Sequence, residues 1–298
     1  MTLFGYNGCM VLDEECKDCL YNSQMKKVEK DQNDESKLAL FKAGVKSLCA
    51  NPPADYCAPL LMRDINNLHC KIFGRGIDYS REKRLFNCAL CALEDRLYGK
   101  IISSREPLRE ALKYSMAANY IDFARLSDLK EDAVPRVVSA AEEVFVDGEV
   151  YASFKEKLAR ARKLCFLHDN CGEIVLDKIL IRVIKKLYKH IKVVSIVRGG
   201  TIINDVTVED AAQIKLYDFA EVVSNGTDVP GTYLKEASPE VIDLLKSDVV
   251  ISKGLGNLET LYGSGYGIFY AFTCKCAHIA KRFGAPLWSS VFTEEKSI

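Results

Sequence analysis

Strand-like and helix-like segments alternate through the second half of the chain. Five short apolar runs are each followed by an amphipathic stretch. The runs cover 163–168, 192–197, 220–224, 248–252 and 267–272, and the stretches cover about 173–190, 208–217, 239–246, a segment from 257, and one ending at 283. Residues 286–291 are a candidate sixth strand. Parallel neighbours need a crossover, so this alternation predicts a mostly parallel sheet with helices on both faces. We predict a three-layer α/β/α, Rossmann-like domain over residues 161–298.

The first half of the chain has a different periodicity. Leu38, Phe41, Val45 and Leu48 recur at the three- and four-residue spacing of one helix face. Similar patterns occur at 56–73, 82–97, 106–119 and 133–145. The charged run at 26–37 is either a linker or the solvated face of a helix. We predict an all-helical domain over residues 1–160 that precedes the α/β/α domain, closes over its pocket and selects substrates.

The bulk composition excludes some classes of partner. The chain has 298 residues, with 41 lysines and arginines against 41 aspartates and glutamates. Zero net charge gives no general attraction for a nucleic-acid backbone, so no nucleic-acid partner is expected. No apolar stretch is long enough to span a membrane, and the N-terminus lacks the pattern of a secretory signal. We expect a cytoplasmic protein with no membrane partner.

Twelve cysteines include two CxxC pairs, Cys16 with Cys19 and Cys88 with Cys91. The pairs lie far apart in the sequence, wider than the spacing of a zinc finger. Three interpretations stay open for them: buried free thiols, a disulfide or redox pair, and a metal site.

Polar residues follow the first two predicted strands of the second half. Asp169 and Asn170 follow the first, and Asp205 lies in the segment after the second. Ligands of such sheets bind beyond the carboxyl ends of the strands, and carboxylate and amide oxygens suit hard divalent cations. Turn formation and helix capping are the alternative for Asp169 and Asn170, and an N-cap is the alternative for Asp205. Because both acids end neighbouring strands, we predict a metal site formed by Asp169, Asn170 and Asp205.

Three later strand ends carry features suited to an anion. Residues 224–232 either present backbone N–H groups to an anion or form two ordinary turns. Lys253 and Gly254 precede a predicted helix, where N–H groups and a lysine suit a phosphate, although a surface salt bridge would also explain the lysine. Lys275 adds a second cation at this edge. A dinucleotide fingerprint is a weaker interpretation, because Glu259 stands at the third glycine position.

In this order, the motifs resemble those of the metal-dependent damage-control phosphatases. The pieces are 169–173 (DNCGE), 198–200 (RGG) with Asn204 and Asp205, 226–232 (GTDVPGT), 253–259 (KGLGNLE) and 118–122 (ANYID). The pair Cys16 and Cys19 resembles that of the small prokaryotic branch of this family.

The resemblance implies roles for individual residues. Asp169, Asn170 and Asp205 would bind a divalent ion such as Mn²⁺, Mg²⁺, Co²⁺ or Ni²⁺. Catalysis would rest on Asp169, Asp205 and Lys253. The residues expected to line or support the pocket, or to contact phosphate and substrate, are Glu173, Asn119, Asp122, Gly254, Asn257 and Lys275.

We therefore predict a metal-dependent phosphomonoester hydrolase for small phosphorylated metabolites, either sugar phosphates or damaged phosphometabolites. Asp169 would be a metal ligand or a nucleophile that forms a phospho-aspartate. Two alternatives stay open: a carboxyl methyltransferase that uses S-adenosylmethionine, and a non-catalytic, metal-dependent protein that binds phosphometabolites.

Overall fold

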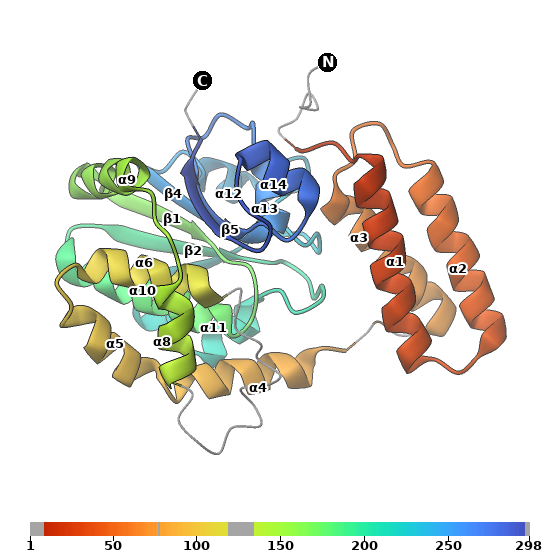
Figure 1. Cartoon of the computed structure of the whole chain (residues 1–298), viewed down its shortest axis with the longest axis horizontal. Coiled ribbons are helices and arrows are strands. Elements are labelled where there is room, and N and C mark those ends of the chain that lie inside the picture. Colours follow the sequence, from red (N-terminus) through yellow and green to blue (C-terminus); the bar gives the residue numbers. More distant parts are fainter. Residues whose placement is uncertain (1–8, 75, 77, 119–133, 296–298) are drawn as a thin grey trace.

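The computed structural model describes residues 9–74, 76, 78–118 and 134–295. Its centre is a six-stranded sheet in the order β3-β2-β1-β4-β5-β6 (Figure 1). The strands are β1 (Lys163–Leu167), β2 (Lys192–Val197), β3 (Glu221–Ser224), β4 (Val249–Lys253), β5 (Phe269–Thr273) and β6 (Ser290–Glu294). Only the pairing of β5 with β6 is antiparallel. The predicted mostly parallel α/β fold is confirmed.

Helices pack on both faces of the sheet because its strands are apolar on both faces. In β1, Leu164 and Phe166 enter one core, and Cys165 and Leu167 enter the other. The first core also contains side chains of α4 (Ser80–Cys91), α5 (Glu94–Ile102), α6 (Pro107–Ala117), α8 (Val134–Glu142), α9 (Gly148–Arg160), α10 (Glu173–Leu187), α11 (Val208–Gln213) and the 3-10 helix Leu216–Asp218. The second contains side chains of α12 (Pro239–Leu244), α13 (Gly254–Leu261) and α14 (Ala277–Phe283).

Three N-terminal helices lie beside this layered body (Figure 1). They are α1 (Glu14–Asp31), α2 (Glu35–Ala50) and α3 (Ala58–Phe73). They bury a core of their own, which includes Val28 from α1, Phe41 from α2 and Ile65 from α3. The N–H of Met10 donates to the carbonyl of Glu259 at 2.7 Å, which fastens the chain ahead of α1 to α13.

Several helix predictions for the first half of the chain need correction. Residues 14–25 of α1 were not predicted, because their polar sequence has little apolar periodicity. The charged run at 26–37, left open as a linker or a helix face, is helical at 26–31 in α1 and at 35–37 in α2. Helix α1 begins after Asp13, whose side chain accepts the N–H of Cys16. Helix α9 was not predicted either. The predicted helix at 82–97 is two helices, α4 and α5, which are separated at Ala92 and Leu93. One hydrophobic core includes side chains from both sides of residue 160, the predicted boundary between the two domains.

The sixth strand begins later than the predicted 286–291. Trp288 has a φ of 65°, a left-handed conformation that no strand accommodates. The N–H of Ser289 donates to the carbonyl of Pro286 at 3.1 Å, so this segment is a turn.

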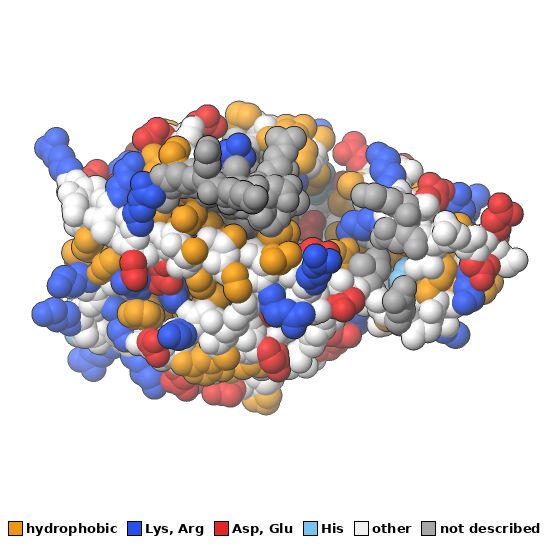
Figure 2. Space-filling model, turned by 90° about the horizontal axis from the view of Figure 1, so that it is seen from below, with side chains coloured by type: hydrophobic (Ala, Val, Ile, Leu, Met, Phe, Trp, Pro, Cys, Tyr) orange, Lys and Arg blue, Asp and Glu red, His pale blue; other side chains and the backbone are white. Residues whose placement is uncertain are grey.

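The surface charges, the helix lengths and the cysteines can be compared with the predictions about partners and thiols. Basic and acidic side chains are interspersed on the face seen in Figure 2. Among the residues that the structure describes, no helix is both long and apolar enough to cross a bilayer. All twelve cysteines are free thiols, and Cys19 and Cys88 are exposed rather than buried.

Candidate metal and phosphate site

Asp169 and Asp205 meet at the carboxyl edge of the sheet. The backbone N–H of Val206 donates to the carbonyl of Asp169 at 2.9 Å, and Asn170 forms an isolated β-bridge with Asp205. The strand order reverses between β1 and β4, so the site lies where doubly wound sheets open a crevice for ligands. The structure thus brings together Asp169, Asn170 and Asp205.

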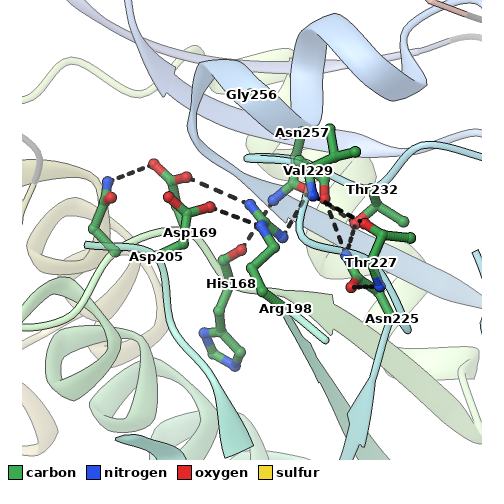
Figure 3. A network of polar contacts seen from close by, with 12 residues as sticks. His168, Asp169, Arg198, Asp205, Asn225, Thr227, Val229, Thr232, Gly256 and Asn257 are labelled. Atoms are coloured by element: carbon green, nitrogen blue, oxygen red, sulfur yellow. Dashed lines mark hydrogen bonds and ion pairs between the residues drawn. The ribbon is translucent and has the colours of Figure 1, made fainter. Parts of the chain in front are cut away.

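Arg198, directly after β2, links the two acids (Figure 3). Its side chain is fully buried. Its Nε donates to Asp205 Oδ2 at 2.7 Å, and its Nη2 lies 3.6 Å from Asp169 Oδ1. Its Nη1 donates to Asn257 Oδ1 at 3.2 Å. Arg198 belongs to the RGG motif at 198–200, for which no role was predicted, and its position directly after a strand was the available signal.

Burial is the largest influence on the pKa of both acids. Burial raises the pKa of Asp169 to about 8, with Glu173 and Asp205 adding to the rise and Arg198 and Lys275 opposing it. Burial also raises the pKa of Asp205, against the effect of Arg198. A bound cation would stabilise the ionised form of carboxyl groups that lie this close together in a buried site.

The donor set is compatible with a hard divalent cation. Asp169 and Asp205 offer carboxylate oxygens, and Asn170 offers a carboxamide whose Nδ2 lies 2.7 Å from Asp169 Oδ2. In the described parts of the chain, no group of three Asp, Glu, His or Cys side chains is arranged to hold a metal. A metal here would therefore need Asn170 beside the two acids, with its remaining positions open to water or substrate.

Lys253 points into the layer of α6 and α10. Alternate residues of β4 face that layer, and Lys253 shares the parity of Val249 and Ile251. Its ammonium group donates to Ser115 O at 2.8 Å, Glu173 Oε1 at 2.6 Å and Asp177 Oδ1 at 2.8 Å. These three bonds use all its hydrogens, so Lys253 holds Glu173 in place instead of extending past the strand end.

A buried network continues from Lys253. The ring of His168 places Nδ1 3.0 Å from Asp177 Oδ2 and Nε2 3.0 Å from Ser195 Oγ. Burial favours the neutral form of Asp177, but Lys253 and His168 outweigh it and lower the pKa of this carboxyl. The network makes a rigid base for the strand end that carries Asp169.

The start of α13 approaches Asp169 closely. Gly254 has a φ of +80°, and a Cβ at this position would lie 2.0 Å from Asp169 Oδ2. Asn257, one turn later, accepts from Thr232 Oγ1 at 3.0 Å as well as from Arg198. Its Nδ2 donates to the carbonyls of His168 and Lys253, so Asn257 ties the two strand ends together.

The loop after β3 is organised by Asn225 (Figure 3). Asn225 Oδ1 accepts from the N–H groups of Gly199 and Thr227, and its Nδ2 donates to the carbonyl of Gly231. Four N–H groups of this loop have acceptors within the loop: those of Gly226, Thr227, Val229 and Gly231. The N–H of Thr232 donates to Thr260 Oγ1 on α13. Of the two interpretations of residues 224–232, these contacts favour the turns.

The remaining predicted residues are Lys275, Asn119 and Asp122. Lys275 is exposed after β5, and its charge lowers the pKa of Asp169, which places it toward the same edge. Asn119 and Asp122 lie outside the described residues.

Comparisons with known proteins identify the family of this chain. Residues 12–291 match the damage-control phosphatase ARMT1-like domain. The chain is 32% identical over 193 residues to an uncharacterized protein of Methanocaldococcus jannaschii, and 32% identical over 191 residues to the damage-control phosphatase PH1575 of Pyrococcus horikoshii. These alignments cover 62% of this chain in both cases, and 62% and 64% of the two relatives. The chain thus spans less than two thirds of the length of either relative.

A solved structure extends the likeness over the whole fold. The crystal structure of a DUF89 family protein from Pyrococcus horikoshii superposes with a TM-score of 0.82 at 25% identity. It covers 96% of this chain and 100% of its own. Since the family match spans nearly the whole sequence, this chain belongs to the damage-control phosphatase family with the ARMT1-like domain.

Proposed function

We propose that this chain is a metal-dependent phosphatase that hydrolyses small phosphate monoesters, such as sugar phosphates or damaged phosphometabolites. The observation that carries the proposal is the pair of Asp169 and Asp205, which a single buried arginine, Arg198, holds at the strand ends. The name of one relative, the damage-control phosphatase PH1575 of Pyrococcus horikoshii, supports the same activity.

In this proposal Asp169, Asn170 and Asp205 hold a divalent ion, either Mg²⁺, Mn²⁺, Co²⁺ or Ni²⁺. When bound, the ion supplies Lewis-acid stabilisation of the charge on the phosphoryl oxygens. Arg198 keeps Asp205 oriented. Lys275 supplies positive charge at the same edge, and the first N–H groups of α13, from Gly254 onward, donate to the phosphate.

The remaining predicted residues act from behind this layer. Lys253 neutralises the carboxylate of Glu173 and holds it in position. Asn257 accepts a hydrogen bond from the guanidinium of Arg198 and fixes the orientation of that group. Asp169 either binds the ion alone or also attacks phosphorus. A labelled phosphoenzyme in an acid-quenched single turnover would identify the attack.

The test starts from protein stripped of metal. Each of the four ions is added back, and phosphate release is measured from a panel of sugar phosphates and from an aryl phosphate. We expect release with at least one ion, and its loss in Asp169→Asn and Asp205→Asn. Asp243→Asn, which changes an exposed acid on α12, is the matched control.

Two results would overturn the proposal: no release with any ion, or equal release by the wild type and both site variants. Demethylated cofactor in a matched assay with S-adenosylmethionine would indicate the methyltransferase instead. Ligand-dependent thermal stabilisation without product would indicate a binding protein.

A further inference from the structure

A cavity opens beside Asp169, between the N-terminal helices and the sheet. Its volume is about 180 Å³. One wall is apolar and comes from the N-terminal helices: Leu20 on α1, and Ala58, Pro59 and Met62 on α3. The opposite side, which belongs to the α/β layers, contains Asp169 and Glu259. The space is smaller than the roughly 300–1,000 Å³ of pockets for drug-sized ligands, which favours a small metabolite.

Glu259 is the acid in this cavity that the proposed metal site does not use. Among the described residues, its carboxyl group has neither a hydrogen-bond donor nor a cation as partner. Burial raises its pKa to about 7, and Asp13 adds to the rise. Asp13 itself is occupied, because its Oδ2 lies 2.5 Å from His278 Nδ1 and its Oδ1 accepts the N–H of Cys16. Glu259 therefore has unused hydrogen-bonding capacity next to the cavity.

The chemistry of the two sides selects what Glu259 can bind. A carboxyl group repels a phosphate, so the end of the substrate near Glu259 is the organic end. A half-buried acid with a pKa close to neutral can accept from a hydroxyl group and, when protonated, donate to one. A substrate ammonium would have to lose its water against Leu20, Pro59 and Met62, which costs far more than the burial of a hydroxyl group.

We propose that Glu259 is a specificity-determining residue that binds a hydroxyl group on the organic part of the phosphate ester, while Leu20, Pro59 and Met62 contact its C–H face. This inference rests on the proposed phosphatase activity. It names the residue that separates polyhydroxylated phosphate esters from others, and it makes the N-terminal helices part of the substrate pocket.

The experiment compares two substrates within each variant. The kcat/KM for a hexose phosphate is divided by the kcat/KM for p-nitrophenyl phosphate, which carries no hydroxyl group. In Glu259→Ala we expect this ratio to fall by about 10- to 100-fold, the value of one hydrogen bond to a charged group. Glu259→Gln, which keeps an acceptor and a donor, should recover most of the ratio. Glu240→Ala, at an exposed acid on α12, should leave the ratio at the wild-type value.

The outcomes separate this inference from the proposed function. An unchanged ratio in Glu259→Ala, with phosphate still released from both substrates, would overturn the role of Glu259 alone. A fall in Glu259→Gln as deep as in Glu259→Ala would also overturn it, since binding would then require a charge. Absence of phosphate release from both substrates by the wild type with every ion would overturn the phosphatase activity and this inference with it.

Discussion

Lys253 and Asp177 form a fully buried ion pair, with 2.8 Å between Nζ and Oδ1. Glu173 shares the same ammonium group. Lys253→Met would leave two buried carboxyl groups without their cation, so we expect a loss of about 3–5 kcal/mol in the free energy of unfolding. Urea titration measures it, with Lys275→Met as the exposed control. Unchanged stability combined with lost activity would show instead that Lys253 acts on the substrate.

Arg198 offers a test of how the acids are positioned. Arg198→Lys keeps a positive charge but cannot contact Asp205 and Asn257 through separate nitrogens of one rigid plane. We expect the affinity for Mn²⁺, measured by calorimetry, to fall by about 10- to 100-fold, as it does when residues that orient metal ligands are changed. Arg160→Lys, at an exposed position on α9, is the control. A dissociation constant equal to that of the wild type would contradict this role.

Gly254 and Gly265 provide a matched pair of substitutions, since both have a φ of +80°. At either position the backbone conformation alone should cost an alanine about 1–2 kcal/mol in stability, because L-residues avoid it. Only at Gly254 would the new Cβ collide with Asp169, whereas nothing lies within 4 Å of it at Gly265. We therefore expect Gly254→Ala to lose phosphate release and Gly265→Ala to retain it. Equal kcat values would refute the close approach.

Asp248 should contribute stability that depends on pH. It accepts the backbone N–H groups of Arg162 and Lys163 at 2.8 and 2.9 Å, and these bonds lower its pKa from the ordinary value of 3.8. A lowered pKa in the folded state stabilises the protein above pH 4 and loses this effect as pH falls through the folded value.

At pH 7, Asp248→Asn should therefore cost about 0.5–1 kcal/mol, at the low end because the group is largely exposed and screened. Urea titrations from pH 7 to pH 3 should show that the difference in the free energy of unfolding between Asp248→Asn and the wild type becomes smaller. A difference that stays constant over this range would be inconsistent with the role of the charge.

The sheet could be predicted from the sequence because its signals are local. Apolar runs and amphipathic stretches alternate regularly, and parallel strands place their carboxyl ends on one edge. That rule alone brought Asp169 and Asp205 together. Helix α1 could not be found in this way, since most of its residues are polar and its apolar side chains become informative only against α2 and α3.

Side-chain direction at the site needed the structure. The sequence placed Lys253 at a strand end beside an expected phosphate. Which face it points to follows from the register of β4 against β1, and its carboxylate partners Glu173 and Asp177 come from α10. The role of Arg198 was hidden for a similar reason, because its contacts with Asp205 and Asn257 join segments far apart in the chain.

The separate core of α1–α3 has a consequence for how such proteins diverge. Val28, Phe41 and Ile65 stabilise these helices against one another, and the layered body has two large cores of its own, although a small cluster packs Leu60 of α3 against Val229 and Tyr233. Substitutions at Leu20 or Met62 can then reshape the mouth of the cavity while the carboxylates at the strand ends stay in place. A lineage built on this plan can acquire new substrates by drift in one small helical unit, and its reaction chemistry is inherited unaltered.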